Sequence, residues 1–150
     1  MKNLILNSQW LPGPNAMPLY FSGTGVTYDD FCINGFRTCS ITLSEDNSTG
    51  NTVYEPEINV YGKQAIDWGF EIRAIEAGHI VLVADFYDAF GELVESSRYN
   101  LSEYVTDCFS RQFGHFPIPR GAQTVHLSIA FSEMVTACTY FSPAAYFTCL

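Results

Sequence analysis

Three short stretches of the sequence place aromatic rings near planar polar groups. Glu71 and Arg73 alternate in the first stretch, Asp85 and Tyr87 in the second, and His126 lies in the third. An aromatic ring can stack on the apolar face of a sugar, while carboxylate, guanidinium and imidazole groups can bond to its hydroxyls. If the three stretches are strands of one sheet, their outward sides form one sugar-binding patch with Tyr87 as its platform. The alternative is that they form ordinary cross-strand polar pairs on a solvated sheet face, each contributing ~0.2–1 kcal/mol.

Trp10 is a further candidate for such a site. It follows polar residues and precedes the segment Leu11–Pro14, whose prolines and glycine favour a loop. The indole ring could therefore be an exposed platform for a sugar, or it could fold back and close one end of the protein core.

The sequence contains no recognisable catalytic or metal-binding motif. The serine-hydrolase pattern GxSxG, the zinc-protease pattern HExxH and a phosphate-binding glycine-rich loop are all absent. The three histidines, His79, His115 and His126, are isolated in the sequence and form no HxH pair. We therefore expect no catalytic residues, no cofactor and no metal site, and we do not expect an enzyme.

The five cysteines form no CxxC pair, so neither a zinc knuckle nor a thioredoxin-type redox motif is indicated. One interpretation is that they are small buried thiols in a reducing compartment. The other includes one disulfide, because the segment Ser142–Ala144 has turn-forming residues. A hairpin centred there would place Cys138 opposite Cys149 on adjacent strands, at a separation that suits a bridge.

The elements that must position these residues are strands. Apolar residues recur mostly with period two, in segments rich in Val, Ile, Thr, Tyr and Phe that are separated by Gly, Pro, Asn and Asp. This pattern accommodates about ten short strands, and the best helical candidate, Asn100–Cys108, covers at most a short turn. Because the helices that parallel crossovers need are missing, the pattern predicts an all-β fold, an antiparallel two-sheet β-sandwich with jelly-roll topology.

Turn residues and alternation refine this expectation. The Asn34–Gly35 pair and the segment Asp88–Gly91 each predict a hairpin, because their residues accept positive φ. In the stretch that starts at Asp67, the alternate residues Trp68, Phe70 and Ile72 are expected to face the core.

Length and charge limit the classes of protein and of partner. The 150 residues suit one packed core, so residues 1–150 are expected to form a single domain. The net charge of −9 makes nucleic acid and anionic lipid surfaces poor partners. No apolar run approaches the ~20 residues that span a bilayer, so no membrane insertion is expected. Met1–Asn7 lacks the long apolar run of a secretory leader, which predicts a cytoplasmic protein or one that reaches a cell or spore surface by another route.

Five segments, taken in order, resemble a known family. They are Asn3–Asn7 (NLILN), Trp68–Ala74 (WGFEIRA), Val81–Asp88 (VLVADFYD), Phe116–Ala122 (FPIPRGA) and Val125–Ile129 (VHLSI). Together they resemble the jelly-roll carbohydrate-binding modules, within the broader galactose-binding-like β-sandwiches. The resemblance extends over nearly the whole chain and implies a sandwich that binds a glycan.

The resemblance also bears on calcium. Members of the family usually follow the opening Asn with a Gly-x-Phe-Glu type segment and end with an Asp-Val strand that contributes to a structural calcium site. The corresponding positions here are Ser8–Trp10 and Pro143–Phe147, so the resemblance leaves a structural calcium site as an alternative, although its usual motif is not matched.

The sequence therefore predicts a non-catalytic binding module for a carbohydrate or a similar polyol. Its expected ligand-binding residues are Tyr87, Arg73, Glu71, Asp85, His126 and Trp10. The alternative is a structural jelly-roll protein of a phage or spore, without a small-molecule ligand. Its self-associating surface would use part of the 15% aromatic content, and it would form a homo-oligomer.

Overall fold

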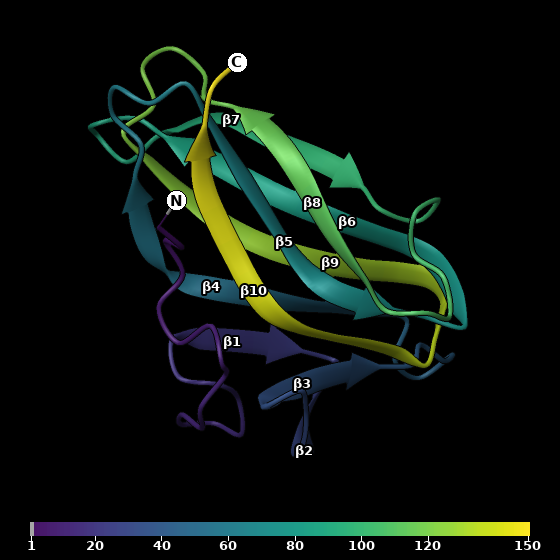
Figure 1. Cartoon of the computed structure of the whole chain (residues 1–150). Coiled ribbons are helices and arrows are strands. Elements are labelled where there is room, and N and C mark those ends of the chain that lie inside the picture. Colours follow the sequence, from purple (N-terminus) through teal and green to yellow (C-terminus); the bar gives the residue numbers. More distant parts are fainter. Residues whose placement is uncertain (1) are drawn as a thin grey trace.

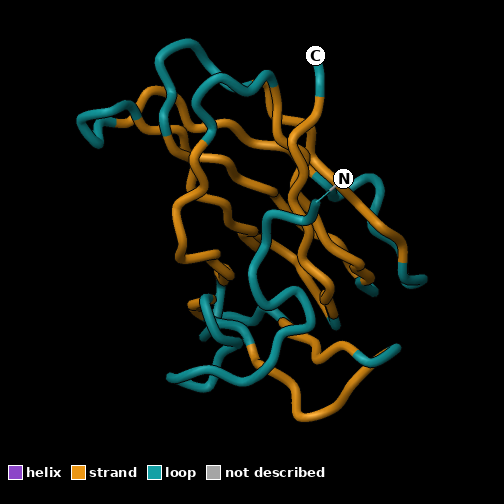
Figure 2. The backbone as a smooth tube through the Cα atoms, turned by 60° about the vertical axis from the view of Figure 1, so that its left-hand side comes forward, coloured by secondary structure: helices purple, strands orange, loops and turns teal. Residues whose placement is uncertain are grey.

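The computed structural model describes residues 2–150 and folds them into two five-stranded antiparallel sheets that lie face to face (Figure 1). The strands are β1 (Phe21–Thr24), β2 (Thr27–Ile33), β3 (Phe36–Ile41), β4 (Thr49–Asn59), β5 (Ala65–Arg73), β6 (Glu76–Tyr87), β7 (Leu93–Asn100), β8 (Ser110–Pro117), β9 (Thr124–Thr136) and β10 (Cys138–Thr148). Loops and turns join the strands, and residues 2–150 contain no helix (Figure 2). This part of the chain therefore has no helix that could cross a membrane.

The order of the strands defines the topology. The first sheet has the order β1-β4-β9-β6-β7, and the second sheet has the order β2-β3-β10-β5-β8. From β3 onward the chain changes sheet at every connection except that between β6 and β7. Strands β3 to β10 thereby form the two four-stranded sheets of a jelly roll, and β1 and β2 add an edge strand to each. The predicted antiparallel jelly-roll sandwich is confirmed.

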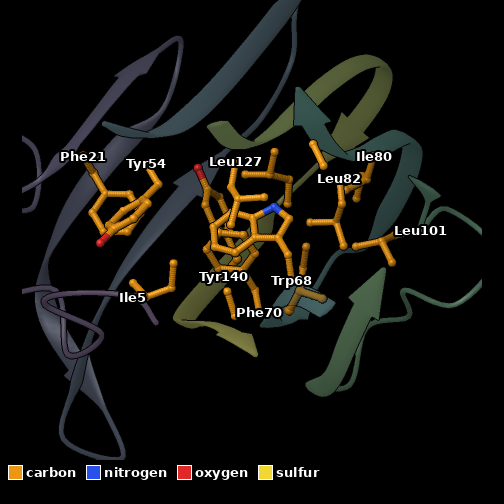
Figure 3. Packing of buried hydrophobic residues seen from close by; sticks show 14 of the residues in the cluster. Ile5, Phe21, Tyr54, Trp68, Phe70, Ile80, Leu82, Leu101, Leu127 and Tyr140 are labelled. Atoms are coloured by element: carbon orange, nitrogen blue, oxygen red, sulfur yellow. The ribbon is translucent and has the colours of Figure 1, made fainter. Parts of the chain in front are cut away.

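The core lies between the sheets and is built around aromatic rings (Figure 3). Trp68, Phe70 and Ile72 of β5 face inward and are fully buried, as alternation predicts. The rings of Trp68 and Phe70 meet edge to face with centroids 4.9 Å apart, and Phe70 meets Tyr140 in the same way at 5.4 Å. The indole Nε1 of Trp68 donates to the backbone oxygen of Ser128 at 3.1 Å, which satisfies this buried donor.

Both predicted hairpins are present. Asn34 and Gly35 have φ values of 53° and 84° and connect β2 to β3, which is the geometry of a two-residue type I′ turn. Asp88 begins the turn between β6 and β7, where the backbone N–H of Gly91 donates to the oxygen of Asp88 at 3.1 Å and Gly91 has a φ of 78°.

The predicted hairpin at Ser142–Ala144 is wrong. β10 continues through this segment and pairs with β5 on both sides of it, from Thr139 opposite Arg73 to Thr148 opposite Ala65. Two residues of β10 oppose one of β5 at this point, and Ser142 has a φ of 53°. The turn-forming residues therefore produce a β-bulge, which tolerates a proline because it interrupts the hydrogen-bond ladder.

The predicted disulfide is wrong for the same reason. Cys138 begins β10 and Cys149 directly follows its last residue, Thr148. The two residues are therefore about 36 Å apart at ~3.3 Å per residue, whereas a disulfide needs Cα atoms within about 7 Å. All five cysteines are free thiols, Cys39 and Cys138 buried and the other three exposed. Burial raises the pKa of Cys138 to about 12, so this thiol stays protonated and unreactive.

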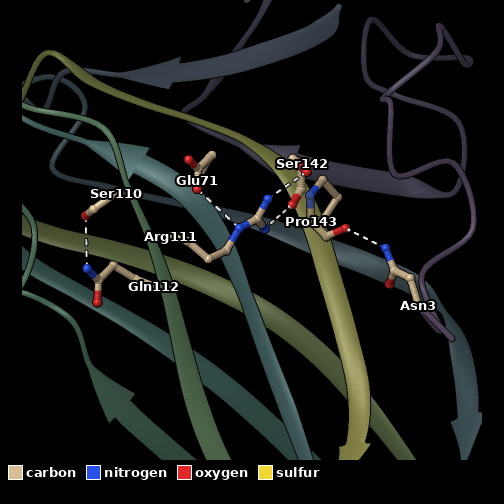
Figure 4. Close-up of polar contacts among 7 residues, drawn as sticks. All are labelled: Asn3, Glu71, Ser110, Arg111, Gln112, Ser142 and Pro143. Carbon is tan, nitrogen blue, oxygen red and sulfur yellow. Dashed lines mark hydrogen bonds and ion pairs between the residues drawn. The ribbon is translucent and has the colours of Figure 1, made fainter. Parts of the chain in front are cut away.

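The segment before β1 runs alongside β10 without forming a strand beside it. The side-chain Nδ2 of Asn3 donates to the backbone oxygen of Pro143 at 3.3 Å (Figure 4). The backbone N–H of Leu4 donates to the oxygen of Ala145 at 2.8 Å. The bulge of β10 is therefore held by this segment.

Candidate functional site

The structure divides the predicted sugar-binding patch between two sheets. Asp85, Tyr87 and His126 lie on the outward side of β6 and β9, which are neighbours in the first sheet. Glu71 and Arg73 lie on β5, which belongs to the second sheet. The prediction of one shared face was wrong because period-two alternation identifies the outward side of a strand without identifying its sheet. The crossing from β5 to β6 places the two halves on opposite outer faces of the sandwich.

Glu71 and Arg73 take part in cross-strand contacts within the second sheet. Glu71 Oε2 lies 3.2 Å from Nε of Arg111 on β8, and Arg111 also donates to the backbone oxygen of Ser142 at 2.6 Å and to its Oγ at 2.9 Å (Figure 4). The guanidinium of Arg73 lies over the ring of Phe109 at 5.8 Å. These contacts tie β5, β8 and β10 together, which is the structural role that the sequence left as the alternative.

Trp10 is not an exposed platform. Its side chain is fully buried, and its ring lies 5.5 Å from that of Phe21, 5.8 Å from Phe70 and 5.7 Å from Tyr140. The ring closes one end of the core, as the alternative interpretation stated, because the segment around it folds back over the sandwich. A sugar has no access to it.

The remaining predicted residues surround a depression of about 590 Å³ at one end of the outer face of the first sheet. We call it the Tyr87 depression, and it is lined by Glu57, Tyr87, Asp88, Ala89, Gly91, Gln123, Thr124 and His126. The ring of Tyr87 meets that of His126 edge to face with centroids 5.3 Å apart. Nε2 of His126 lies 3.2 Å from Oε1 of Glu57.

Strand register explains how these side chains meet. Asp85 is opposite His126 and Tyr87 is opposite Thr124 in the pairing of β6 with β9. On the other side of β9, the register with β4 shifts between Tyr54 and Ile58, so that three residues of β4 oppose His126. This irregularity, which contains Pro56, brings Glu57 beside the imidazole.

The hairpin between β6 and β7 forms the rim of the Tyr87 depression. Oδ1 of Asp88 accepts hydrogen bonds from the backbone N–H groups of Phe90 at 2.8 Å and Glu92 at 3.0 Å. These bonds fix the turn, as is typical of an Asp at this place. Phe90, in the middle of the turn, is 90% exposed. A fixed backbone therefore presents a phenyl ring to solvent beside the depression.

A second depression, of about 370 Å³, lies farther along the same face. We call it the Arg98 depression, and it is lined by Thr24, Thr49, Gly50, Asn51, His79, Val81, Arg98, Ala130, Phe131 and Ser132. Asp85 lies on β6 between the two depressions, where it accepts a hydrogen bond from Oγ of Ser96 at 2.5 Å. Val81 and Val83, which face outward from β6, are only 6% and 5% exposed, so the middle of the face has an apolar floor.

Sequence reasoning missed four residues of this face: Glu57, Phe90, Arg98 and His79, the last of which was considered only as a metal ligand. The Asp88–Gly91 turn signal located the loop that carries Phe90 but gave no information on its exposure. Only the pairing of β7 with β6 places Arg98 on this face.

The groups at this face can bind a ligand. It offers aromatic rings, hydrogen-bonding side chains and an apolar floor. No group of three or more His, Cys, Asp or Glu residues in the described part of the chain has the arrangement of a metal site.

No protein-family model matches the sequence, and no curated protein matches it by sequence at significant similarity. Solved structures do match the fold. TmCBM61, solved in complex with β-1,4-galactotriose, is 8% identical with a TM-score of 0.59, and the match covers 99% of this chain and 100% of that one. The CBM22-1 xylan-binding domain of Xyn10C from Paenibacillus barcinonensis is 11% identical with a TM-score of 0.58, over 95% of this chain and 92% of that one.

A third match is part of a larger protein. The enzymatically active domain of tailspike protein 4 from bacteriophage CBA120 is 17% identical with a TM-score of 0.64. The match covers 85% of this chain but only 19% of the tailspike chain, so the present chain spans about a fifth of that protein. Together with the whole-length matches, this establishes that the chain has the jelly-roll β-sandwich fold of the carbohydrate-binding modules.

Proposed function

We propose that this chain is a non-catalytic carbohydrate-binding module that holds a glycan on the outer face of the first sheet. The observation that carries the proposal is the Tyr87 depression, where an aromatic ring lies beside the hydrogen-bonding groups of His126 and Glu57 in an open hollow. Sugars need this combination, because they present apolar C–H faces together with hydroxyls that both donate and accept.

The side chains of the depression are held in place before any ligand arrives. The imidazole of His126 contacts the Tyr87 ring on one side and the Glu57 carboxylate on the other. The backbone of Tyr87 is fixed as well, since its oxygen accepts from the N–H of Gln123 at 2.8 Å. Such preorganisation favours binding because few rotamers remain to be ordered when the ligand binds.

The dimensions of the face suit an oligosaccharide. From His79 to Tyr87, β6 extends about 26 Å at ~3.3 Å per residue, and one depression lies near each end. The two module structures that match over their full length agree with this proposal, since one contains a galactotriose and the other is a xylan-binding domain.

A glycan array tests the proposal, with the wild type compared with Tyr87→Ala and Tyr146→Ala. Tyr146 lies in the second sheet beside Phe113, with ring centroids 6.1 Å apart, so its truncation removes a tyrosine from the opposite face. We expect the wild type and Tyr146→Ala to bind the same glycans and Tyr87→Ala to bind at least ~10-fold more weakly, a loss of ~1.4 kcal/mol. Binding is expected to persist in EDTA because no metal is needed. Equal binding by Tyr87→Ala, or no binding by the wild type, would contradict the proposal.

A structural, self-associating protein is the second candidate, and the outer face of the second sheet favours it. Phe109 and Phe36 contact Phe141 there with ring centroids 5.3 and 5.9 Å away, and Phe113 and Tyr146 form a second pair. Aromatic residues are enriched at subunit contacts. Size-exclusion chromatography with light scattering distinguishes the candidates: a binding module is expected as a monomer, whereas an assembly protein forms a stable oligomer that Phe109→Ser dissociates.

A further inference from the structure

The Arg98 depression has a charge opposite to that of the chain as a whole. The sequence has 16 Asp and Glu residues against 7 Lys and Arg, with a net charge of −9. The lining of this depression nevertheless contains Arg98 and His79 and, within the described residues, no carboxylate. At the other end of the same face, the Tyr87 depression is lined by Glu57 and Asp88. The two ends therefore differ in the ligand groups that they favour.

Arg98 is free to bind a ligand. It is an exposed residue opposite Val83 in the pairing of β7 with β6, and its side chain forms no ion pair or hydrogen bond among residues 2–150. Two of the other arginines have partners: Arg37 donates from Nε to the backbone oxygen of Asp29 at 2.8 Å, and Arg111 pairs with Glu71. Asp85, the outward carboxylate of the adjacent β6, accepts from Ser96 and forms no ion pair with Arg98.

The groups around Arg98 add hydrogen-bonding capacity. Nδ1 of His79 lies 3.2 Å from Oγ of Ser132, which leaves Nε2 of this ring available on the same side of the sheet. Thr24 and Asn51 line the opposite wall, and Val81 lies on the floor between them. A guanidinium can hold two oxygens of a carboxylate or sulfate at once, and neighbouring hydroxyl and imidazole groups can bond to the rest of the sugar.

We infer that the Arg98 depression recognises an anionic group, a carboxylate or a sulfate ester, on one unit of the bound glycan. This inference rests on the proposed function and adds a class of ligand to it. The net charge of −9 disfavours a densely charged polyanion, because the rest of the surface repels it. An isolated acidic unit within a largely neutral glycan avoids this repulsion, since charges beyond ~8 Å are screened at physiological ionic strength.

The test uses a glycan array on which oligosaccharides are printed in charged and neutral pairs. Uronic acids are paired with their methyl esters, and sulfate esters are paired with their desulfated forms. We expect the wild type to bind a charged member at least 10-fold more strongly than its neutral partner. The uronic acid pairs and the sulfate pairs show which of the two anionic groups is preferred. The preference should weaken as NaCl is raised, because the contact is electrostatic and partly exposed.

Two variants with the same change in charge isolate the effect of Arg98. Arg98→Gln removes the guanidinium from the depression, whereas Lys63→Gln removes a cation that lies 5.1 Å from the ring centroid of Phe147 in the second sheet. We expect Arg98→Gln to lose the preference for the charged partner and to melt like the wild type. Lys63→Gln should keep the preference.

Three outcomes decide between failure of the inference and failure of the proposed function. Equal binding of charged and neutral partners by the wild type overturns the inference and leaves the module function intact. A preference that survives in Arg98→Gln also overturns it, since another group must then bind the anion. Absence of binding to every glycan of either kind contradicts the proposed function itself.

Discussion

Truncation of Trp10 tests whether this residue closes the core or binds a ligand. Its side chain is fully buried among Phe21, Phe70 and Tyr140, with ring centroids 5.5–5.8 Å away. Removing a buried Trp side chain costs ~3–5 kcal/mol, because both its contacts and the space it fills are lost. For a domain of this size, each kcal/mol corresponds to a shift in Tm of about 2–4 °C, so Trp10→Ala is expected to melt ~6–20 °C below the wild type.

Trp10→Phe provides the matched control. The buried Nε1 of Trp10 has no hydrogen-bond partner among the described residues. Phenylalanine keeps much of the ring contact and removes this unpaired donor, whose burial costs ~1–3 kcal/mol. We therefore expect Trp10→Phe to lose less than half of the free energy of unfolding lost by Trp10→Ala.

Urea unfolding followed by circular dichroism and by fluorescence measures both variants, and Trp68 remains as the only tryptophan in each. The outcome that refutes the reasoning is a Trp10→Ala variant that melts like the wild type but no longer binds glycans. Trp10 would then be the exposed platform that the sequence left as one alternative.

Three further predictions follow from the same structure. Phe90→Ala is expected to weaken glycan binding several-fold without a change in Tm, because the side chain is 90% exposed and borders the Tyr87 depression. Calorimetric titration measures the binding and thermal melting measures the Tm. Unchanged binding would contradict the prediction. The protein should lose stability as the pH rises above about 10, because burial holds the pKa of Tyr140 well above its usual 10 while the unfolded chain ionises normally. Urea midpoints measured from pH 8 to 11 check the sign, and a Tyr140→Phe variant should show a smaller decline. A thiol reagent should modify the three exposed cysteines, Cys32, Cys108 and Cys149, in the folded protein and all five cysteines in denaturant. Fewer than five free thiols in denaturant would indicate a disulfide.

The sequence predicted the fold well because the fold depends on local patterns. Alternation in the Trp68 stretch identified its buried side, and the Asn34–Gly35 pair identified a tight hairpin. The failure at Ser142–Ala144 has a physical cause. Pro143 and a residue with positive φ suit both a turn and a bulge, and only the partner strand β5, which continues past this point, decides between them.

The site was predicted only in part because it depends on which strands become neighbours. Tyr87 and His126 were correctly placed on one face, whereas Glu71 was assigned to it although β5 lies in the other sheet. The irregular register of β4 against β9 places Glu57 beside His126, and the pairing of the edge strand β7 with β6 places Arg98 on the outer face of the first sheet. No residue pattern within either segment encodes these pairings.

The central claim, that a glycan binds on the outer face of the first sheet, is tested most directly by nuclear magnetic resonance. The ¹⁵N-labelled protein is titrated with the glycan that binds most strongly on the array. We expect the largest shifts at the backbone amides of β6 and β9 near Tyr87 and His126, with little change around Phe113 and Tyr146. Shifts concentrated on the outer face of the second sheet would contradict the claim.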